Sequence, residues 1–330
     1  ICNNYVIYSD GKFKTVRIWP RKSLHMFADE TEYHETVRQI AEVMKSTLGL
    51  IAQKWERPAV SVTGGRDSKG SLAASIHVKE KYQYFSYNSQ PAEKVDCDAA
   101  EMICKAVGVP HITYEIPLDK AVYPEYDLVR AILCVNSNRR YFNHNDIMKR
   151  IYLRKANPFD VEAKSWTSEI GRAFYYKRYG VQRMQKKCTA RRVNAMNNIF
   201  LMNPALMYAT DARYRDYLRS TAYNEHMFNY DWSDIIDLEM RDSRWGADVL
   251  SCEHMFSHDV TVPYNNRHLS DLMLMVPLAD RIADRTHIDF THELCPAIDA
   301  TNISVRDVAH NNKRMWMDKI YYFITSVRLF

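Results

Sequence analysis

The sequence lacks the cysteine spacings and long apolar runs that define several large protein classes. Its seven cysteines form no CxxC pair. An odd number of scattered cysteines indicates neither a disulfide framework nor a cysteine zinc site, and a reducing cytoplasm is the simplest location to expect. No apolar run approaches the roughly 20 residues that span a bilayer, and the first residues lack the layout of a signal peptide. We therefore expect no membrane partner.

The sequence also lacks a strong excess of charge of either sign. Lys and Arg number 45 against 40 Asp and Glu, a formal charge of +5 over 330 residues. This excess is too small to indicate a nucleic-acid or membrane surface. The most basic region, residues 177–192, has few interleaved aromatic residues, which favours a solvated helix face over a polyanion-binding surface. We expect no nucleic-acid partner.

The stretch that organises the chain is a predicted strand, glycine turn and helix at residues 59–76. Ala59 to Val62 are small or β-branched, Gly64 and Gly65 allow a tight turn, and Asp67 or Ser68 is a suitable helix cap. The N–H groups of the first helical turn and the positive end of the helix dipole converge at such a turn. The stretch has the layout of an anion-binding site.

The segments around this turn predict an α/β fold, with a parallel sheet covered by helices on both faces and a mostly helical C-terminal part. Further strands are expected at 82–88 and 111–116, with a helix at 96–107 between them. This alternation implies right-handed crossovers, and ligands then bind at the carboxyl ends of the strands, where 63–68 lies.

The outer segments are predicted from the same kinds of pattern. Residues 5–19 read as a hairpin around Asp10-Gly11, and residues 31–55 as a long amphipathic helix that should cover one face of the sheet. Beyond Pro117, helical patterns cover residues 126–135, 145–153 and 170–184.

The glycine turn does not match the two commonest phosphate-binding motifs. Gly65 and Gly70 have GxxxxG spacing, but Ser71 and Leu72 follow where a Walker A loop needs Lys and then Ser or Thr. A GxGxxG dinucleotide motif is absent. The turn, Thr-Gly-Gly-Arg-Asp-Ser at 63–68, instead resembles the SGGxDS pyrophosphate loop (PP-loop) of adenylating ATP pyrophosphatases. The simpler alternative is a Gly-Gly turn without a ligand.

Three downstream segments narrow the resemblance to the synthetase domain of asparagine synthetase and its relatives, which include β-lactam synthetase and lasso-peptide cyclases. Residues 167–176 are similar to SGEGSDELFGGY, with Glu169 on the first glutamate and Arg172-Ala173 in place of Asp-Glu. Residues 259–267 are similar to E-x-R-x-PFLD, with Thr261 and Asn266 replacing the arginine and aspartate. Residues 294–296 are similar to a Leu-Pro turn that lysines flank in the family, where a lysine holds the released phosphate. No lysine lies close to this turn here, so Arg285 is expected to hold the phosphate instead, with Arg281 and Arg306 as alternatives.

The resemblance implies a domain organisation and a reaction. Residues 56–330 would form the synthetase-like domain, of the adenine nucleotide alpha hydrolase-like fold, and residues 1–55 an N-terminal hairpin and helix or the end of an upstream domain. The family adenylates a carboxylate with ATP and Mg²⁺, releases pyrophosphate and forms an amide with an amine or ammonia. Because Arg172-Ala173 replaces residues that read the amino acid, aspartate is not the expected substrate; a small-molecule, sugar or peptide carboxylate is. Too few residues precede the turn for a glutaminase domain, so ammonia would require a separate glutaminase subunit or an upstream domain.

The resemblance also implies roles for individual residues. The pyrophosphate cradle would comprise Ser61, Thr63, Gly64, Gly65, Arg66, Ser68 and Arg285. Asp67 would hold Mg²⁺ or fix the loop, Glu169 would act as general base toward the amine, and adenine would lie near Tyr87 and Asn88.

Other interpretations compete with an amide-forming ligase. A relative that binds nucleotide without chemistry and serves a partner protein is favoured by the departures at Arg172, Ala173, Thr261 and Asn266. A tRNA-modifying PP-loop enzyme is the third, although the cysteine pair that such enzymes often use is absent. His254 and His258 stand four residues apart, but without a third ligand they are expected to be ordinary helix residues rather than a metal site.

Overall fold

The computed structural model describes residues 3–136, 142–198, 203–223, 227–303 and 312–328. Its centre is a sheet of five strands, all parallel, in the order β5-β4-β3-β6-β7. The strands are β3 (Pro58–Ser61), β4 (Gln83–Asn88), β5 (His111–Glu115), β6 (Val161–Ala163) and β7 (Asp259–Thr261). The predicted parallel sheet is confirmed. The sequence reading missed β6 and β7.

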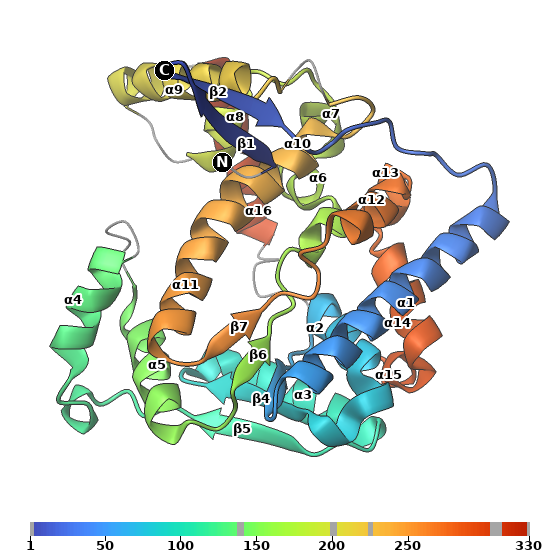
Figure 1. The fold of residues 1–330 in the computed structure, drawn as a ribbon, viewed down its shortest axis with the longest axis vertical. Coiled ribbons are helices and arrows are strands. Elements are labelled where there is room, and N and C mark those ends of the chain that lie inside the picture. Colours follow the sequence, from blue (N-terminus) through green and yellow to red (C-terminus); the bar gives the residue numbers. More distant parts are fainter. Residues whose placement is uncertain (1–2, 137–141, 199–202, 224–226, 304–311, 329–330) are drawn as a thin grey trace.

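Helices cover both faces of the sheet, as predicted (Figure 1). Helix α2 (Arg66–Ser75) follows β3, and α3 (Pro91–Ala106) follows β4; these helices share a core with Val60 and Tyr84. On the other face, Ala59 and Phe85 pack with Leu153 of α5 (His144–Ala156). Neighbouring residues of β3 and β4 thus point to opposite faces, which is the two-residue period of a strand.

The strand order reverses between β3 and β6. The chain proceeds outward from β3 to β4 and β5, then returns to the other side of β3 for β6 and β7. The loops that leave the carboxyl ends of β3 and β6 therefore diverge, and a crevice opens between them. This topology positions the candidate site.

The long predicted helix is present as α1 (Glu30–Lys54), capped by the Asp29 side chain, which accepts from the Glu32 N–H. It packs chiefly on α2 and on α14 (Arg285–Leu294), and its buried residues share one core with β3. The Tyr82 hydroxyl, just before β4, donates to the Leu48 carbonyl at 2.7 Å. The helix thus covers the sheet face through α2 rather than lying directly on the strands.

The predicted hairpin is also present, as β1 (Asn4–Ser9) and β2 (Lys12–Arg17), paired antiparallel. It lies against the helical part of the chain, beside α9 (Pro204–Ser220), and away from the five-stranded sheet (Figure 1). The buried Arg17 guanidinium donates to Glu239 at 2.7 Å and to the Thr221 carbonyl at 2.9 Å. These contacts join the hairpin to the helical part.

The remaining elements are mostly helical, as expected. The helical pattern at 170–184 is broken at Ala173 (φ 50°) and Gly180 (φ 94°), so three short helices replace one. No helix among the described residues has the length and apolar character needed to cross a membrane. The helices are η1 (Ile76–Lys81), η2 (Lys120–Val122), α4 (Tyr126–Asn136), η3 (Ser168–Arg172), α6 (Phe174–Tyr179), α7 (Val181–Met184), α8 (Ala190–Asn197), α10 (Trp232–Ile236), η4 (Asp237–Gly246), α11 (Ala247–Phe256), α12 (Arg267–Met275), α13 (Leu278–Ile282), α15 (Pro296–Ala300) and α16 (Asn312–Val327).

Candidate active site

A cavity of about 440 Å³ opens at the carboxyl ends of β3, β4 and β6. The glycine turn after β3 lines one side, and the segment after β6, from Lys164 to Trp166, lines another. The η4 segment contributes Arg241, Asp242 and Trp245. The cavity thus occupies the crevice that the reversal of strand order creates.

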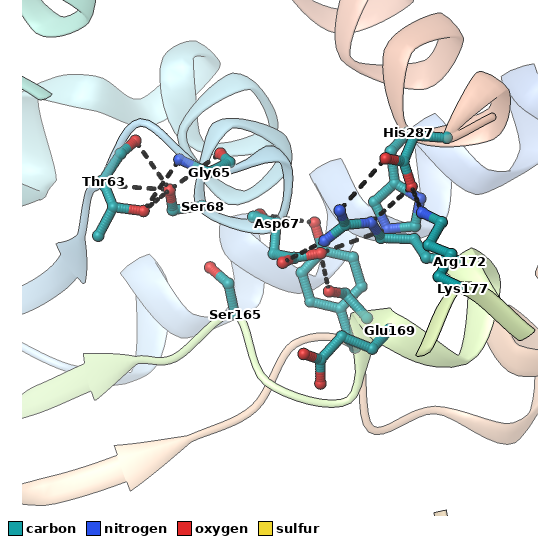
Figure 2. Close-up of polar contacts among 12 residues, drawn as sticks. Thr63, Gly65, Asp67, Ser68, Ser165, Glu169, Arg172, Lys177 and His287 are labelled. Carbon is teal, nitrogen blue, oxygen red and sulfur yellow. Dashed lines mark hydrogen bonds and ion pairs between the residues drawn. The ribbon is translucent and has the colours of Figure 1, made fainter. Parts of the chain in front are cut away.

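The turn at 63–68 is held in shape by hydroxyl groups (Figure 2). The Thr63 N–H donates to Ser68 Oγ at 3.0 Å, and the Gly65 N–H donates to Thr63 Oγ1 at 3.1 Å. The Gly64 N–H points to the Asp96 carboxylate, 3.2 Å away on α3. Helix α2 begins at Arg66, so its first N–H groups have no acceptor within the helix. A carboxylate therefore already lies where the turn presents a donor to anions.

Asp67 is held by a cation and a hydroxyl. Arg172 donates to Asp67 Oδ2 at 2.7 Å, and Ser168 donates to Oδ1. Arg172 also bridges to Asp284 with contacts of 2.7 and 3.3 Å, and Lys177 bonds the same carboxylate (Figure 2). Although burial acts in the opposite direction, these two cations lower the pKa of Asp284 to about 2. Arg172 therefore serves as the centre of an ion-pair network around Asp67.

His287 lies under this network and is fully buried. Neither ring nitrogen has a hydrogen-bond partner within the part of the chain that the structure describes, and Nε2 stands 3.8 Å from Asp67 Oδ1. Burial lowers the pKa of His287 to about 4, against the opposing effect of the Asp67 charge. The imidazole is thus neutral near pH 7 and packs as an aromatic ring beside Tyr264 and Phe290.

The floor of the cavity is a buried charged cluster at the end of β6. The Lys164 ammonium lies 2.8 Å from Glu162 and 3.2 Å from Glu253. Glu162 also accepts from the Tyr87 hydroxyl at 2.9 Å and contacts His258 at 3.0 Å. Burial alone would raise the pKa of Glu162, but Lys164 and His258 outweigh it and lower that pKa.

His258 of this cluster also belongs to a group of three candidate metal ligands. Glu162, Glu253 and His258 offer ligand atoms within 4.8 Å of one another. The Lys164 ammonium already contacts both carboxylates and Arg150 lies 3.4 Å from Glu253, so two internal cations balance the two acids. The prediction that His254 and His258 are both helix residues is wrong for His258: α11 ends at Phe256, and His258 lies beyond it, buried against Glu162.

Glu169 lies across the cavity from the turn, beside a second charged cluster. Its Oε2 accepts from Arg241 at 2.9 Å. The same guanidinium nitrogen is 3.3 Å from Asp237 and 3.5 Å from Asp242. Burial raises the pKa of Asp237, and it raises that of Asp242 to about 7 despite Arg241. Three carboxylates thus share one cation at this end of the cavity.

Two tryptophans complete this end. Trp166 follows β6, and Trp245 comes from η4; their rings stack with centroids 4.9 Å apart and planes 13° apart. Trp245 is 39% exposed. The pair provides an aromatic surface next to Glu169, Arg241 and Asp242, all of which line the same cavity.

The cavity carries more negative than positive charge. Six acidic and three basic side chains line it among the described residues: Asp67, Glu93, Asp96, Glu162, Glu169, Asp242, Lys149, Lys164 and Arg241. Each base is paired with one of these acids: Lys149 lies 2.5 Å from Glu93, Lys164 lies 2.8 Å from Glu162, and Arg241 lies 2.9 Å from Glu169. An anionic ligand therefore needs an accompanying cation to bind here.

The structure brings most of the sequence-predicted residues together. Ser61, Thr63, Gly65, Asp67, Ser68, Tyr87 and Glu169 line the cavity. Gly64 takes part through its N–H bond to Asp96. Arg66 and Asn88 do not belong to the described lining; the Asn88 amide instead donates to Glu115 at 2.8 and 3.0 Å.

Arg285 is not placed at the cavity. Its guanidinium pairs with Glu30 and lies 4.0 Å over the Tyr33 ring, on the side where α14 meets α1. Of its rivals, Arg281 is buried against Asp234 at 2.7 Å, and Arg306 lies outside the described residues. The expected cation role of Arg285 is thus corrected: the basic residues that line the cavity are Lys149, Lys164 and Arg241.

Sequence reasoning missed most residues that surround the turn. Asp96 and Glu93 lie on a helix whose start was placed at Asp96, whereas α3 begins at Pro91. Lys164 and Glu162 belong to the missed strand β6. A Glu-x-Lys pattern after an apolar residue is the available sequence signal for β6. Because charged residues are rare in buried strands, this pattern does not by itself predict a strand.

The residues at the turn fit a phosphate group better than a metal ion, the two groups that the resemblance implies there. The Asp67 carboxylate is ion-paired with Arg172 and also accepts from Ser168, so its negative charge is already compensated; it does not fit a magnesium ligand in this arrangement, and its contacts support the loop-fixing role. The turn and the first turn of α2 fit a phosphate group, provided that Asp96 yields the Gly64 N–H. ATP would therefore enter as its magnesium complex.

Compared with models of known protein families, the chain matches none, and no curated protein is similar enough in sequence to count as a match. The resemblance rests on the residues quoted above.

Proposed function

We propose that the chain is an ATP-dependent carbon–nitrogen ligase with a PP-loop ATPase fold of the asparagine synthetase type. It would adenylate a carboxylate with magnesium-bound ATP, release pyrophosphate and join the activated carbonyl to an amine. One observation carries this proposal. The Thr63–Ser68 turn and Glu169 come from loops after different strands, yet both line one cavity at the point where the strand order reverses.

The turn suits the leaving pyrophosphate. Pyrophosphate gains negative charge as it departs, and preorganised N–H groups at a helix start stabilise such charge. The N–H groups of Gly64 and of the first turn of α2 are the donors, and the Thr63–Ser68 hydroxyl bond keeps the turn rigid. Phosphate binding displaces the Asp96 carboxylate from Gly64, because two anions do not share one donor.

Glu169 suits the second half of the reaction. The attacking amine must lose a proton, and a carboxylate in contact with the cavity can accept it. Arg241 fixes the orientation of that carboxylate through the 2.9 Å contact. The adenine ring would lie toward Tyr87 and Ser86 at the end of β4.

The identity of the carboxylate is limited by Arg172. In this chain the residue bonds Asp67 and Asp284, and so it offers no uncompensated charge to a substrate. It also replaces a residue that reads aspartate in the asparagine synthetases. These features support a carboxylate other than aspartate.

One observation favours a second candidate, a nucleotide-binding relative that does no chemistry. Arg172 neutralises Asp67, the acid that the resemblance assigns to magnesium. A binding module needs the turn and the cavity but no metal ligand. The two candidates differ in whether pyrophosphate is released.

The test is pyrophosphate formation from ATP in the presence of a panel of small-molecule, sugar and peptide carboxylates. The ligase proposal predicts release that depends on one carboxylate and yields AMP in equal amount. ATP binding without AMP formation across the panel would support the binding module. Failure to bind ATP at all would contradict both.

A further inference from the structure

The Glu169 end of the cavity contains an acid without a matching donor. Asp242 lines the cavity, its side chain is 10% exposed, and its Oδ2 is covered by protein yet has no hydrogen-bond partner among the described residues. Its Oδ1 is 3.5 Å from Arg241, a guanidinium that lies closer to Glu169 and Asp237. A buried carboxylate oxygen without a donor is costly, so the arrangement favours a ligand that brings one.

The charge of this end of the cavity defines the sign of that ligand. Four groups, Glu169, Asp237, Asp242 and Arg241, carry two more negative than positive charges when all are ionised. Elsewhere in the cavity, Asp67 is paired with Arg172, Glu162 with Lys164 and Glu93 with Lys149, while Asp96 accepts from Gly64. The uncompensated acids are therefore concentrated at this end of the cavity, where burial raises the pKa of Asp242 to about 7 and a bound cation would favour its charged form.

The tryptophan pair distinguishes an organic cation from ammonia. Trp245 stacks on Trp166 and remains 39% exposed beside the acids. An indole face attracts an ammonium group by the cation–π effect and gives apolar contact to attached carbon atoms. Ammonium itself would meet the negative charge and an indole face but would make no use of the apolar surface beside them.

We infer that Asp242, Glu169 and the Trp166–Trp245 pair form a subsite for an organic primary ammonium, the amine substrate of the ligase. The inference rests on the proposed function for its role in the reaction, but the binding itself requires no ATP. The Asp242 side chain turns toward the ammonium and its carboxylate accepts an N–H, and Glu169 lies beside it to take the proton that the amine must lose before attack. A separate glutaminase that supplies ammonia is then unnecessary.

The test measures the binding of ethylammonium to the full chain without ATP. Binding is monitored by NMR through the signals of the tryptophan indole N–H groups. A Trp245→Phe variant identifies the Trp245 signal. Ethylammonium chloride should shift this signal in a saturable way, whereas ethanol, a neutral molecule of similar size, and sodium chloride at equal ionic strength should not. Equal shifts with ethanol, or none with ethylammonium, would overturn the inference.

Two variants and one control locate the binding. Asp242→Asn keeps the shape of the side chain and should weaken ethylammonium binding about tenfold or more, since the hydrogen bond to a charged group is lost. Trp245→Ala changes a partly exposed residue and should weaken binding as well, which keeps the test valid if the Asn variant does not fold. Asp216→Asn removes an exposed acid on α9 and should change nothing. Undiminished binding in the folded Asp242→Asn variant would refute the subsite.

This experiment separates the subsite from the ligase proposal. Ethylammonium binding with no pyrophosphate release would refute the ligase and keep the cation subsite. Pyrophosphate release with no ethylammonium binding would keep the ligase and refute the subsite.

Discussion

Replacement of Lys164 by Met should strongly destabilise the fold, because the lysine is the main cation beside the buried Glu162 and also contacts Glu253. Glu162 is fully buried, Lys164 is 8% exposed, and the ammonium lies 2.8 Å from the carboxylate. Methionine retains the apolar stem but leaves Glu162 charged and without its main cation. Breaking such a buried pair costs about 3–5 kcal/mol. We expect a loss of this size in the free energy of unfolding, measured by urea denaturation at pH 7.

A double variant tests whether the pair causes this loss. Glu162→Gln with Lys164→Met removes both charges, while the amide oxygen still accepts from Tyr87. The loss of unfolding free energy in the double variant should be smaller than the sum of the two single-variant losses by about 2 kcal/mol or more. The control is Lys94→Met, whose exposed pair with Asp98 at 3.0 Å should contribute about 0.5 kcal/mol or less.

The pH dependence gives a further check on the same variant. Lys164 lowers the pKa of Glu162, so this acid stabilises the fold above its ordinary pKa of 4.5, and that stability is lost as the pH falls below it. The difference between the native chain and Lys164→Met should therefore shrink below about pH 4.5. A loss under about 1 kcal/mol at pH 7, or additive losses in the two single variants, would refute the reasoning.

Other predictions concern residues around the turn. Gly70→Ala should destabilise the fold by about 1–3 kcal/mol, because a Cβ there would lie 2.7 Å from Phe290 Cζ and would also press on the Tyr264 hydroxyl. The matched control is Gly49→Ala, whose Cβ would meet the edge of the His77 ring at 3.2 Å. Equal thermal stability of the two variants would contradict the packing argument. His287→Phe should flatten the pH dependence of stability. Since the buried imidazole has a pKa of about 4 instead of 6.5, the native chain should lose up to about 3 kcal/mol as the pH falls from 6.5 to 4, and an unchanged slope in the variant would exclude His287 as the cause. Arg172→Met should lower the free energy of unfolding, measured with denaturant, by about 1–3 kcal/mol, which is less than for a fully buried pair because the partners of Arg172 are partly exposed. Arg172→Lys should recover only part of this loss, because a lysine cannot bridge Asp67 and Asp284 with the same geometry. Full recovery would contradict the bridging role.

The fold was predictable where the sequence repeats a pattern over enough residues. The strand, turn and helix at 59–76 combine a β-branched run, two glycines and a helical period, and the structure has β3 and α2 there. The 25-residue helix α1 repeats its apolar spacing many times. Strands β6 and β7 have three residues each, which is too short for a two-residue period to show.

The site was less predictable, because its members meet only through the topology. The Arg241 of η4 contacts Glu169 across 72 positions of sequence, and Lys164 contacts Glu253 from another element. No local pattern signals such a pairing. Arg285 shows the opposite failure: because no lysine flanks the Leu-Pro turn, the sequence suggests Arg285 as the cation, whereas the packing of α14 on α1 gives it Glu30 as a partner.

The central claim is that the turn at 63–68 binds the pyrophosphate part of ATP during adenylation. Its most direct test is carboxylate-dependent exchange of labelled pyrophosphate into ATP, compared between the native chain, Asp67→Ala and the control Asp98→Ala, which changes an exposed acid on α3. The account predicts exchange in the native chain and the control, and none in a folded Asp67→Ala variant, since Arg172 and Ser168 then lose the carboxylate that positions the turn. Undiminished exchange in Asp67→Ala would contradict the claim.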